Sequence, residues 1–329
     1  MNHGRTRLET VGVRVSAEYG RLASRTVTTG LAFPEGPVAF RDGTVLVAEI
    51  RAGRLTRVDP NGEKRTCAET GGGPNGTAIG PDGAAYVCNN GGSKWAKRPW
   101  PHEDPGAIEL LLPVSGEPGA SIQRVDMGSG QVESVYAACG SESLKRPNDI
   151  VFDAEGGFWF TDSGGGTARV RNATGVLYAT PDGSRIEEVI HPLEMPNGIG
   201  LSPDGRTLYI AETRTRRLWA CALAGPGRVR TRRVLATIPS GGPLNVGGCD
   251  SLCVDAQGNV IVATLGSGGV TVVSPEGEII AHVPLDDPMT TNACFGGPEL
   301  RTLFVTAGST GRLVAFDGWP VPGLPLAFG

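Results

Sequence analysis

Pro196-Asn197-Gly198-Ile199 begins an apolar run, and the turn Ser202-Pro203-Asp204-Gly205 ends eight residues after Asn197. The same combination of a polar residue, an apolar run and a turn occurs six times in the chain. An oxygen-bearing side chain opens each run, at Glu35, Asn75, Asn148, Asn197, Asp250 and Asn292. The turns end eight residues later in every case, at Gly43, Gly83, Gly156, Gly205, Gly258 and Leu300. A spacing that recurs in this way indicates a structural repeat, and we predict that the six polar residues form a ring around one central channel.

A second set of turns alternates with the first, from Asp59-Pro60-Asn61-Gly62 to Phe316-Asp317-Gly318. Pro fixes φ and Gly supplies positive φ, so these stretches are turns for a physical reason. Two sets of hairpins imply groups of four antiparallel strands, and about 40–50 residues per group is typical of β-propeller blades. The sequence therefore predicts an all-β protein, a six-bladed β-propeller with four antiparallel strands per blade and a central channel.

The repeats predict a single propeller domain over residues 25–329, preceded by an N-terminal extension over residues 1–24. The first strand of the domain, Arg25-Thr26-Val27-Thr28-Thr29, is expected to close the ring as an outer strand. One insertion is far longer than the other loops and runs from residue 91 to residue 119 in the second blade. It lies on the same face as the ring residues in this topology. It is either a lid over the channel mouth or a surface excursion packed on its own aromatic side chains.

Composition excludes several classes of protein. The net charge is −4 and no basic stripe is present, which argues against a nucleic-acid partner. No run of about 18 apolar residues predicts a membrane span, and no apolar segment follows the charged N-terminus, so a secretory signal is not predicted. We expect a cytoplasmic protein, a monomer or weak homo-oligomer. The seven Cys residues form no Cys-x-x-Cys pair and are expected to be reduced thiols.

The side chains of the ring carry carboxylate and amide oxygens. Four of these positions together carry two negative charges: the acids are Glu35 and Asp250, and the amides are Asn148 and Asn197. Such a set of oxygen donors suits a hard divalent cation. We predict Ca²⁺, with Mg²⁺ or Mn²⁺ as alternatives. Zn²⁺ is the last alternative, because the four His residues show no His-x-x-x-His spacing. The alternative is that these residues only cap turns. Turn capping would explain an Asn at a single ring position, but it gives no reason for acidic residues at two of the six ring positions.

The chain resembles the senescence marker protein/gluconolactonase/luciferin-regenerating-enzyme family, six-bladed propellers that include regucalcin. The resemblance extends from about Gly30 to Arg312. The motifs that carry it are Phe33-Pro34-Glu35-Gly36-Pro37, Arg146-Pro147-Asn148-Asp149, Pro196-Asn197-Gly198-Ile199, Asp250-Ser251 with Cys253-Val254-Asp255, and Thr290-Thr291-Asn292-Ala293-Cys294-Phe295. It implies Glu35, Asn197 and Asp250 as metal ligands, with Asn148 as a ligand or substrate contact and Arg146 as a contact to polar substrate.

These observations lead to three hypotheses on function. The first is a divalent-metal-dependent lactonase, a hydrolase of cyclic esters in which Asp250 is the catalytic residue that orients or deprotonates water. The second keeps the site but hydrolyses an aryl ester or a phosphotriester, and the third is a non-enzymatic calcium-binding propeller. No Gly-x-Ser-x-Gly motif supports a serine hydrolase. The expected partner is a small-molecule substrate, bound by Arg146, Asn75, Asn292, Asn148, Asp162, Trp95 and Trp100.

The ends of the second strands supply further candidates for the wall of the channel. Asp162, Glu212, Thr264 and Thr306 lie near these ends. They are expected either to line the channel or to be solvated strand ends.

Overall fold

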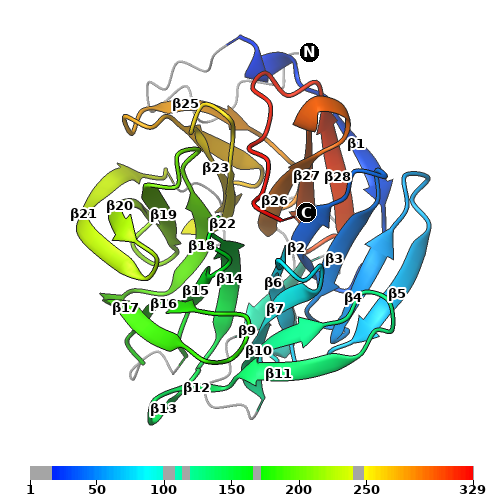
Figure 1. The fold of residues 1–329 in the computed structure, drawn as a ribbon. Coiled ribbons are helices and arrows are strands. Elements are labelled where there is room, and N and C mark those ends of the chain that lie inside the picture. Colours follow the sequence, from blue (N-terminus) through cyan, green and yellow to red (C-terminus); the bar gives the residue numbers. More distant parts are fainter. Residues whose placement is uncertain (1–16, 99–107, 113–118, 166–171, 240–247, 329) are drawn as a thin grey trace.

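The computed structural model describes residues 17–98, 108–112, 119–165, 172–239 and 248–328. Six antiparallel sheets of four strands each surround a central axis (Figure 1). The six-bladed β-propeller predicted from the spacing of the turns is therefore confirmed.

The blades follow one another along the chain, each listed here from its inner strand outward. Blade 1 contains β2 (Pro34–Ala39), β3 (Val45–Glu49), β4 (Arg54–Val58) and β5 (Lys64–Glu69). Blade 2 contains β6 (Pro74–Ile79), β7 (Ala85–Asn90), β10 (Ala120–Val125) and β11 (Val132–Tyr136). Blade 3 contains β14 (Pro147–Phe152), β15 (Phe158–Asp162), β16 (Thr174–Ala179) and β17 (Ile186–Leu193).

Blade 4 contains β18 (Pro196–Leu201), β19 (Thr207–Glu212), β20 (Arg217–Gly225) and β21 (Arg228–Thr237). Blade 5 contains β22 (Gly248–Val254), β23 (Val260–Leu265), β24 (Val270–Val273) and β25 (Ile279–Val283). Blade 6 contains β26 (Thr290–Gly296), β27 (Thr302–Ala307), β28 (Arg312–Asp317) and β1 (Ser24–Thr28).

Two small ribbons and two short 3-10 turns complete the described structure. The ribbons are β8 (Lys94–Arg98) with β9 (Ile108–Leu112), and β12 (Ala138–Cys139) with β13 (Glu142–Ser143). The 3-10 turns are η2 (Tyr19–Arg21) and η3 (Pro298–Leu300). Within the described residues, no helix is long and apolar enough to cross a membrane.

The ring is closed by β1, the first strand of the chain, which pairs with β28 near the other end of the chain. Ser24 lies opposite Phe316 and Thr26 opposite Val314 in this antiparallel pair. The predicted closing strand is therefore confirmed. Just before it, Tyr19 packs edge-on against Trp319 with a ring separation of 5.3 Å, which ties η2 to the same blade.

The core lies between neighbouring blades because both faces of the second strands are covered. The side chains of β3, β7, β15, β23 and β27 are all buried, as expected for strands packed on two sides. Between blades 2 and 3 the contact is aromatic: Tyr86 of blade 2 lies 5.2 Å from Phe152 and 5.9 Å from Phe158 of blade 3. All seven Cys residues are free thiols, as predicted.

The inner turn of blade 6 differs from the others because Leu300 stands where the other five blades have Gly. Leu300 has φ of 55° and Gly205, at the same place in blade 4, has φ of 67°. Only Gly adopts this left-handed region without a steric cost of about 1–2 kcal/mol. A Cβ added at Gly205 would meet no atom within 4 Å, so a change there reports on backbone conformation alone.

We expect Gly205→Ala to lower the free energy of unfolding by about 1 kcal/mol. We expect Leu300→Gly to raise it by up to about 1 kcal/mol, since relief of the left-handed strain exceeds the added chain entropy of Gly. Urea denaturation of both variants beside the unchanged protein checks the pair. Equal midpoints for all three proteins would contradict it.

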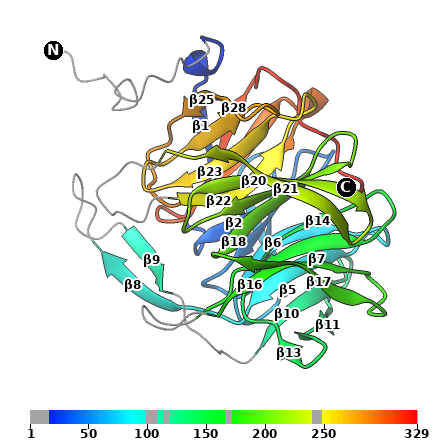
Figure 2. The same ribbon diagram turned by 90° about the vertical axis from the view of Figure 1, so that its left-hand side faces the viewer.

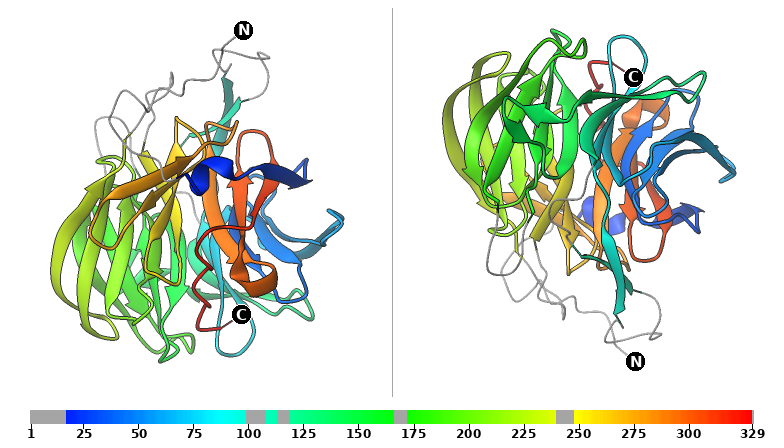
Figure 3. Two further views of the ribbon diagram at one scale, coloured as in Figure 1. Left: turned by 90° about the horizontal axis from the view of Figure 1, so that it is seen from above. Right: turned by 90° about the horizontal axis from the view of Figure 1, so that it is seen from below.

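The β8–β9 ribbon of blade 2 and the C-terminal segment lie at opposite ends of the propeller axis. The β8–β9 ribbon projects away from the blades (Figure 2). In Figure 3 it lies on one face of the propeller and the C-terminus on the other. Trp95 of β8 is among the described residues, whereas Trp100 and most of the insertion's loop lie outside them. Most of the predicted N-terminal extension, residues 1–16, also lies outside the described residues.

Candidate active site

A local irregularity in every inner strand shapes the ring of polar residues. The register of each inner strand against the second strand shifts at the ring position, for example between Glu35 and Val38 and between Pro196 and Ile199. The corresponding shifts lie at Pro74/Thr77, Pro147/Ile150, Cys249/Leu252 and Thr290/Asn292. Such bulges re-aim side chains and are common beside active sites. The inner turns lie at the other ends of these strands, so the ring and the turns occupy opposite faces.

Glycine after the ring residue lets neighbouring inner strands approach closely. A Cβ on Gly76 would lie 2.5 Å from the Cα of Asp149, and one on Gly198 would lie 2.6 Å from the backbone nitrogen of Leu252. Neither distance is possible for a real side chain. The Asn-Gly pairs of blades 2 and 4 therefore bring the ring residues of successive blades together, which is a reason for Gly that the turn pattern alone does not reveal.

Three buried carboxyl groups, not two, interact at the ring. Burial first, and then the charge of Asp250, raise the pKa of Glu35 well above its usual value. Burial raises the pKa of Asp250 to about 8, although a hydrogen bond from Asn197 opposes the shift and the charge of Asp149 adds to it. Burial likewise raises the pKa of Asp149 to about 7. Three carboxylates without a neighbouring cation are therefore costly to ionise here.

Asp149 was not among the predicted ring acids, and the expectation that Glu35 and Asp250 are the only two is wrong. Strand alternation places Asn148 and Asp149 on opposite faces, but the bulge between Pro147 and Ile150 breaks that alternation. Asp149 accepts hydrogen bonds from the backbone nitrogens of Ile150 and Ile199, at 3.0 and 3.3 Å, and so links blades 3 and 4. The position of Asp149 directly after the ring residue Asn148 was the sequence signal that could have identified it as a further acid of the site.

The amides of the ring divide into two pairs. Asn292 donates to Glu35 Oε2 at 2.9 Å and accepts from the backbone nitrogen of Ala293, while Asn197 donates to Thr213 and accepts from the Ser251 hydroxyl. The Oδ1 atoms of Asn75 and Asn148 are buried and have no hydrogen-bond partner. A buried carbonyl oxygen without a partner is destabilising. A cation coordinated by these oxygens would remove that cost.

The donors at the ring fit a hard cation more closely than a soft one. Within the described part of the chain, no group of three or more His, Cys, Asp or Glu side chains is arranged to hold a metal ion. Coordination at this ring would therefore need amide oxygens as well as carboxylates. Such a donor set suits Ca²⁺ or Mg²⁺ and does not suit Zn²⁺, which prefers nitrogen and sulfur ligands.

The ends of the second strands are buried, so of the two alternatives the one in which they are solvated is wrong. Asp162 is 4% exposed, Glu212 2%, and Thr264 and Thr306 are fully buried. Asp162 accepts hydrogen bonds from the backbone nitrogens of Lys145, Arg146 and Gly164 at 2.7–3.0 Å. Its carboxylate therefore fixes the segment that leads into β14.

Arg146 stands two residues before the ring residue Asn148. Its side chain is buried, and its Nη2 atom donates to the Ser93 hydroxyl at 3.2 Å. Burial lowers the pKa of Arg146, and the charge of Asp162 partly offsets the shift. Because Ser93 belongs to the insertion of blade 2, Arg146 connects this insertion to the entrance of blade 3.

Trp95 ties the β8–β9 ribbon to residues that flank the ring. Its ring centre lies 5.0 Å from that of Phe33, which directly precedes Pro34 and Glu35. Trp95 also packs against the buried cluster of Phe33, Ile50, Leu265 and Met289, which comes from blades 1, 5 and 6. The ribbon starts in blade 2, so this contact extends across the ring face.

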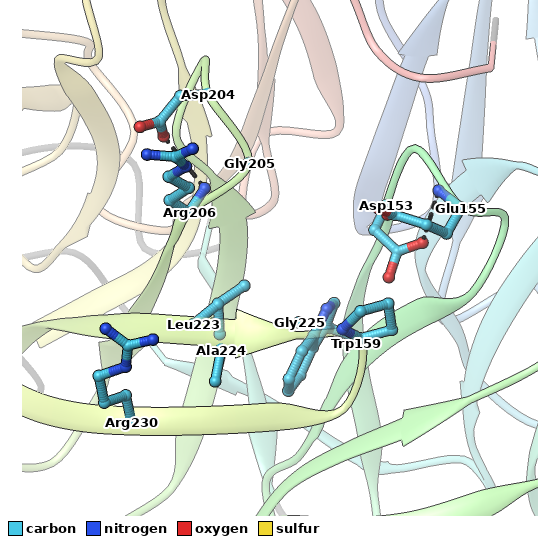
Figure 4. Close-up of a pocket in the computed structure, with 11 residues that line it drawn as sticks. Asp153, Glu155, Trp159, Asp204, Gly205, Arg206, Leu223, Ala224, Gly225 and Arg230 are labelled. Atoms are coloured by element: carbon cyan, nitrogen blue, oxygen red, sulfur yellow. Dashed lines mark hydrogen bonds between the residues drawn. The ribbon is translucent and has the colours of Figure 1, made fainter.

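A separate cavity of about 490 Å³ lies between blades 3 and 4 and contains no ring residue (Figure 4). Asp153 and Asp204 line it, and both carboxylates accept hydrogen bonds within their own turns. The buried Nε1 atom of Trp159, another residue of the lining, has no partner. This cavity lies beside the inner turns, on the face away from the ring, and we do not assign the active site to it.

Known proteins share both the sequence motifs and the fold. Residues 33–309 match the family described as SMP-30/Gluconolactonase/LRE-like region. Lactonase drp35 of Staphylococcus haemolyticus (strain JCSC1435) is 30% identical over 256 residues, covering 76% of this chain and 68% of that protein. The diisopropyl-fluorophosphatase of Loligo vulgaris is 32% identical over 184 residues, 52% of this chain and 56% of that protein. A solved gluconolactonase of Xanthomonas campestris has the same fold, with a TM-score of 0.70 over 93% of this chain and 92% of that chain at 23% identity. The chain therefore belongs to the SMP-30/gluconolactonase/LRE-like family.

Proposed function

We propose that this protein is a divalent-metal-dependent lactonase that opens cyclic esters at the ring. The observation that carries the proposal is the set of three interacting buried carboxyl groups beside two amide oxygens without partners. Lactonase drp35 is a relative over 76% of this chain, which favours a lactone as the substrate. The preferred ion is Ca²⁺, with Mg²⁺ or Mn²⁺ as alternatives.

Glu35, Asn148, Asn197 and Asp250 would hold the ion, and Asn75 joins them as a candidate because its Oδ1 is equally without a partner. When bound, a divalent cation supplies Lewis-acid polarisation of a carbonyl and acidification of water. Glu35 serves as the fixed anionic ligand, since Asn292 and the backbone nitrogen of Gly36 both donate to its Oε2. These two hydrogen bonds hold the carboxylate in one orientation.

Asp250 is the residue that we assign to proton transfer. Its carboxylate accepts a proton from the attacking water while the water oxygen bonds to the carbonyl carbon. The bond between the carbonyl carbon and the ring oxygen then breaks, and Asp250 returns the proton to that oxygen, so that the ring-opened product leaves as a hydroxy acid. Ser251 follows it and donates to Asn197 Oδ1, which stabilises this part of the ring. Arg146 would orient a hydroxyl or carboxylate of the substrate from the side of the blade 2 insertion, with Asp162 holding its backbone.

Two alternative functions would use the same site. The similarity to the diisopropyl-fluorophosphatase of Loligo vulgaris favours a phosphotriester or aryl ester as the second candidate substrate. A calcium-binding propeller without turnover is the third. A panel of lactones, aryl esters and phosphotriesters, followed with a pH indicator with and without chelator, separates them. Chelator-sensitive turnover of lactones alone supports the proposal. Turnover of phosphotriesters alone supports the second function, and metal binding without turnover the third.

Trp95 gives a prediction for the role of the insertion. Trp95→Ala removes the contact with Phe33 and with the Arg51 guanidinium, which lies 6.0 Å from the centre of the Trp95 ring. We expect KM for a lactone to rise several-fold while kcat and metal affinity stay near their original values, since a contact made equally in ground and transition states affects KM alone. Initial rates across substrate concentrations, together with calcium titration, test this. An unchanged KM and unchanged selectivity would make the insertion a surface feature.

A further inference from the structure

A cavity of about 350 Å³ extends along the propeller axis from just beneath the ring to the opposite face. Asp149 and Asn292 lie at its ring end, and residues 324–328 lie at the other end. Figure 1 shows the C-terminal end of the chain close to the centre of the six blades. The volume is within the range of small-molecule sites, which is roughly 300–1,000 Å³.

The lining of this cavity is apolar and carries no positive charge. Val151, Leu201 and Phe295 are only partly buried among its lining residues, so their side chains meet its free space. Of the described residues that line it, two are acidic, Asp149 and Asp204, and none is Lys or Arg. An anionic ligand such as a fatty acid would meet no counter-charge. The lining favours a neutral ligand that is largely apolar.

The cover of the cavity is weakly attached. The last backbone hydrogen bonds among the described residues are donated by Gly323 to Leu300 at 2.8 Å and by Leu324 to Val254 at 3.1 Å. Within the described residues, 325–328 make no hydrogen bond, and Phe328 is held by an edge-on contact with Phe152 at 5.9 Å. Leu326 lines the cavity yet is 55% exposed, unlike nearly all other large apolar side chains of the described structure.

We propose that this axial cavity is a second binding site, for a neutral, largely apolar small molecule that enters from the face opposite the active site. Residues 325–328 occupy the entrance in the structure, where Leu326 and Phe328 take the place of ligand atoms. Displacement of these residues opens the site without breaking a hydrogen bond of the blades, because hydrogen bonding within the described chain ends at Leu324. The site lies beneath the ring and is distinct from the mouth where Trp95 packs.

The test uses N-phenyl-1-naphthylamine, a neutral probe whose fluorescence rises in apolar surroundings. Four proteins are titrated: the full chain, a chain ending at Leu324, the same shortened chain with Leu201→Trp, which fills the cavity, and the shortened chain with Trp95→Ala, which alters only the mouth. Circular dichroism and thermal unfolding check that each is folded. Val151→Phe replaces Leu201→Trp if the latter does not fold.

We expect about one probe per chain and affinity at least about tenfold higher in the shortened chain than in the full chain. The cavity-filling variant should bind at least about tenfold more weakly than the shortened chain without the substitution, while the shortened chain with Trp95→Ala should bind as the shortened chain does. Binding by the shortened chain with none by the full chain also supports the proposal. Affinity of the folded cavity-filling variant equal to that of the shortened chain, loss of binding on Trp95→Ala, or no binding by the folded shortened chain would overturn it. None of these readouts depends on turnover, so the result stands apart from the proposed lactonase activity.

Discussion

Asp250→Asn is expected to lower kcat for lactone hydrolysis by about 10² or more, the usual contribution of a general acid–base group. The change keeps the size of the side chain and one oxygen, and removes the charge and the basicity. Asp250 interacts electrostatically with both Glu35 and Asp149, so the variant also relieves repulsion within the ring. Metal is therefore expected to remain bound at saturating Ca²⁺ while turnover is lost.

Glu35→Gln is the matched comparison, because it makes the same chemical change at the other predicted acidic ligand. Its Oε2 accepts two hydrogen bonds that hold it in place, which suits a fixed ligand. We expect Glu35→Gln to weaken metal affinity and to recover much of its kcat in excess ion. Metal content and kcat are measured for both variants over a range of Ca²⁺ concentrations. Near-normal kcat in metal-loaded Asp250→Asn would leave Asp250 a ligand without a role in proton transfer.

The metal-free protein is expected to lose stability as the pH rises. Folding raises the pKa of Asp149 to about 7 and that of Asp250 to about 8, from 3.8 for an exposed Asp. The folded state therefore holds protons that the unfolded state has released between about pH 4 and pH 8, so folding is favoured at low pH. This contribution is complete below the unfolded pKa values and disappears as the pH passes through the folded ones.

The expected result is a Tm of the chelator-treated protein that is several degrees lower at about pH 8.5 than at about pH 5.5, with the decrease abolished by saturating Ca²⁺. A bound cation favours the ionised carboxylates and removes the reason for proton uptake. The control is Asp250→Asn, which should show a shallower decrease without metal because one of the titrating groups is gone. A metal-free Tm that does not change over this pH interval would show that the ring carboxyl groups are not linked to folding.

The fold could be predicted because its signal is a spacing. The eight-residue separation between Asn197 and Gly205 recurs in every blade, with Leu300 tolerated at the sixth position at the cost of a left-handed backbone. The closing strand was predicted at residues 25–29 and is observed one residue earlier, at residues 24–28. Turn chemistry and alternation were sufficient for these features because both are local properties of the chain.

The details of the site could not be predicted in the same way, because they depend on departures from regular strand geometry. Alternation assigns Asp149 to the opposite face from Asn148, and only the bulge in β14 reverses this. Asp162 is buried with three backbone donors from two loops, the one before β14 and the one after β15, and the sequence does not specify the path of either loop. The axial cavity is closed by Phe328, which contacts Phe152. These two residues are far apart in the chain, and no local sequence pattern predicts their contact.

The most direct test of a cation-dependent lactonase at the ring measures occupancy and turnover in one sample. Chelator-treated protein is titrated with Ca²⁺, and bound ion and lactone hydrolysis are recorded at each addition. We predict that activity is absent at the start and rises in proportion to bound Ca²⁺ until about one ion per chain is present. Full lactone turnover by protein without divalent metal, or saturation of the ion site with no turnover of any lactone, would contradict the account.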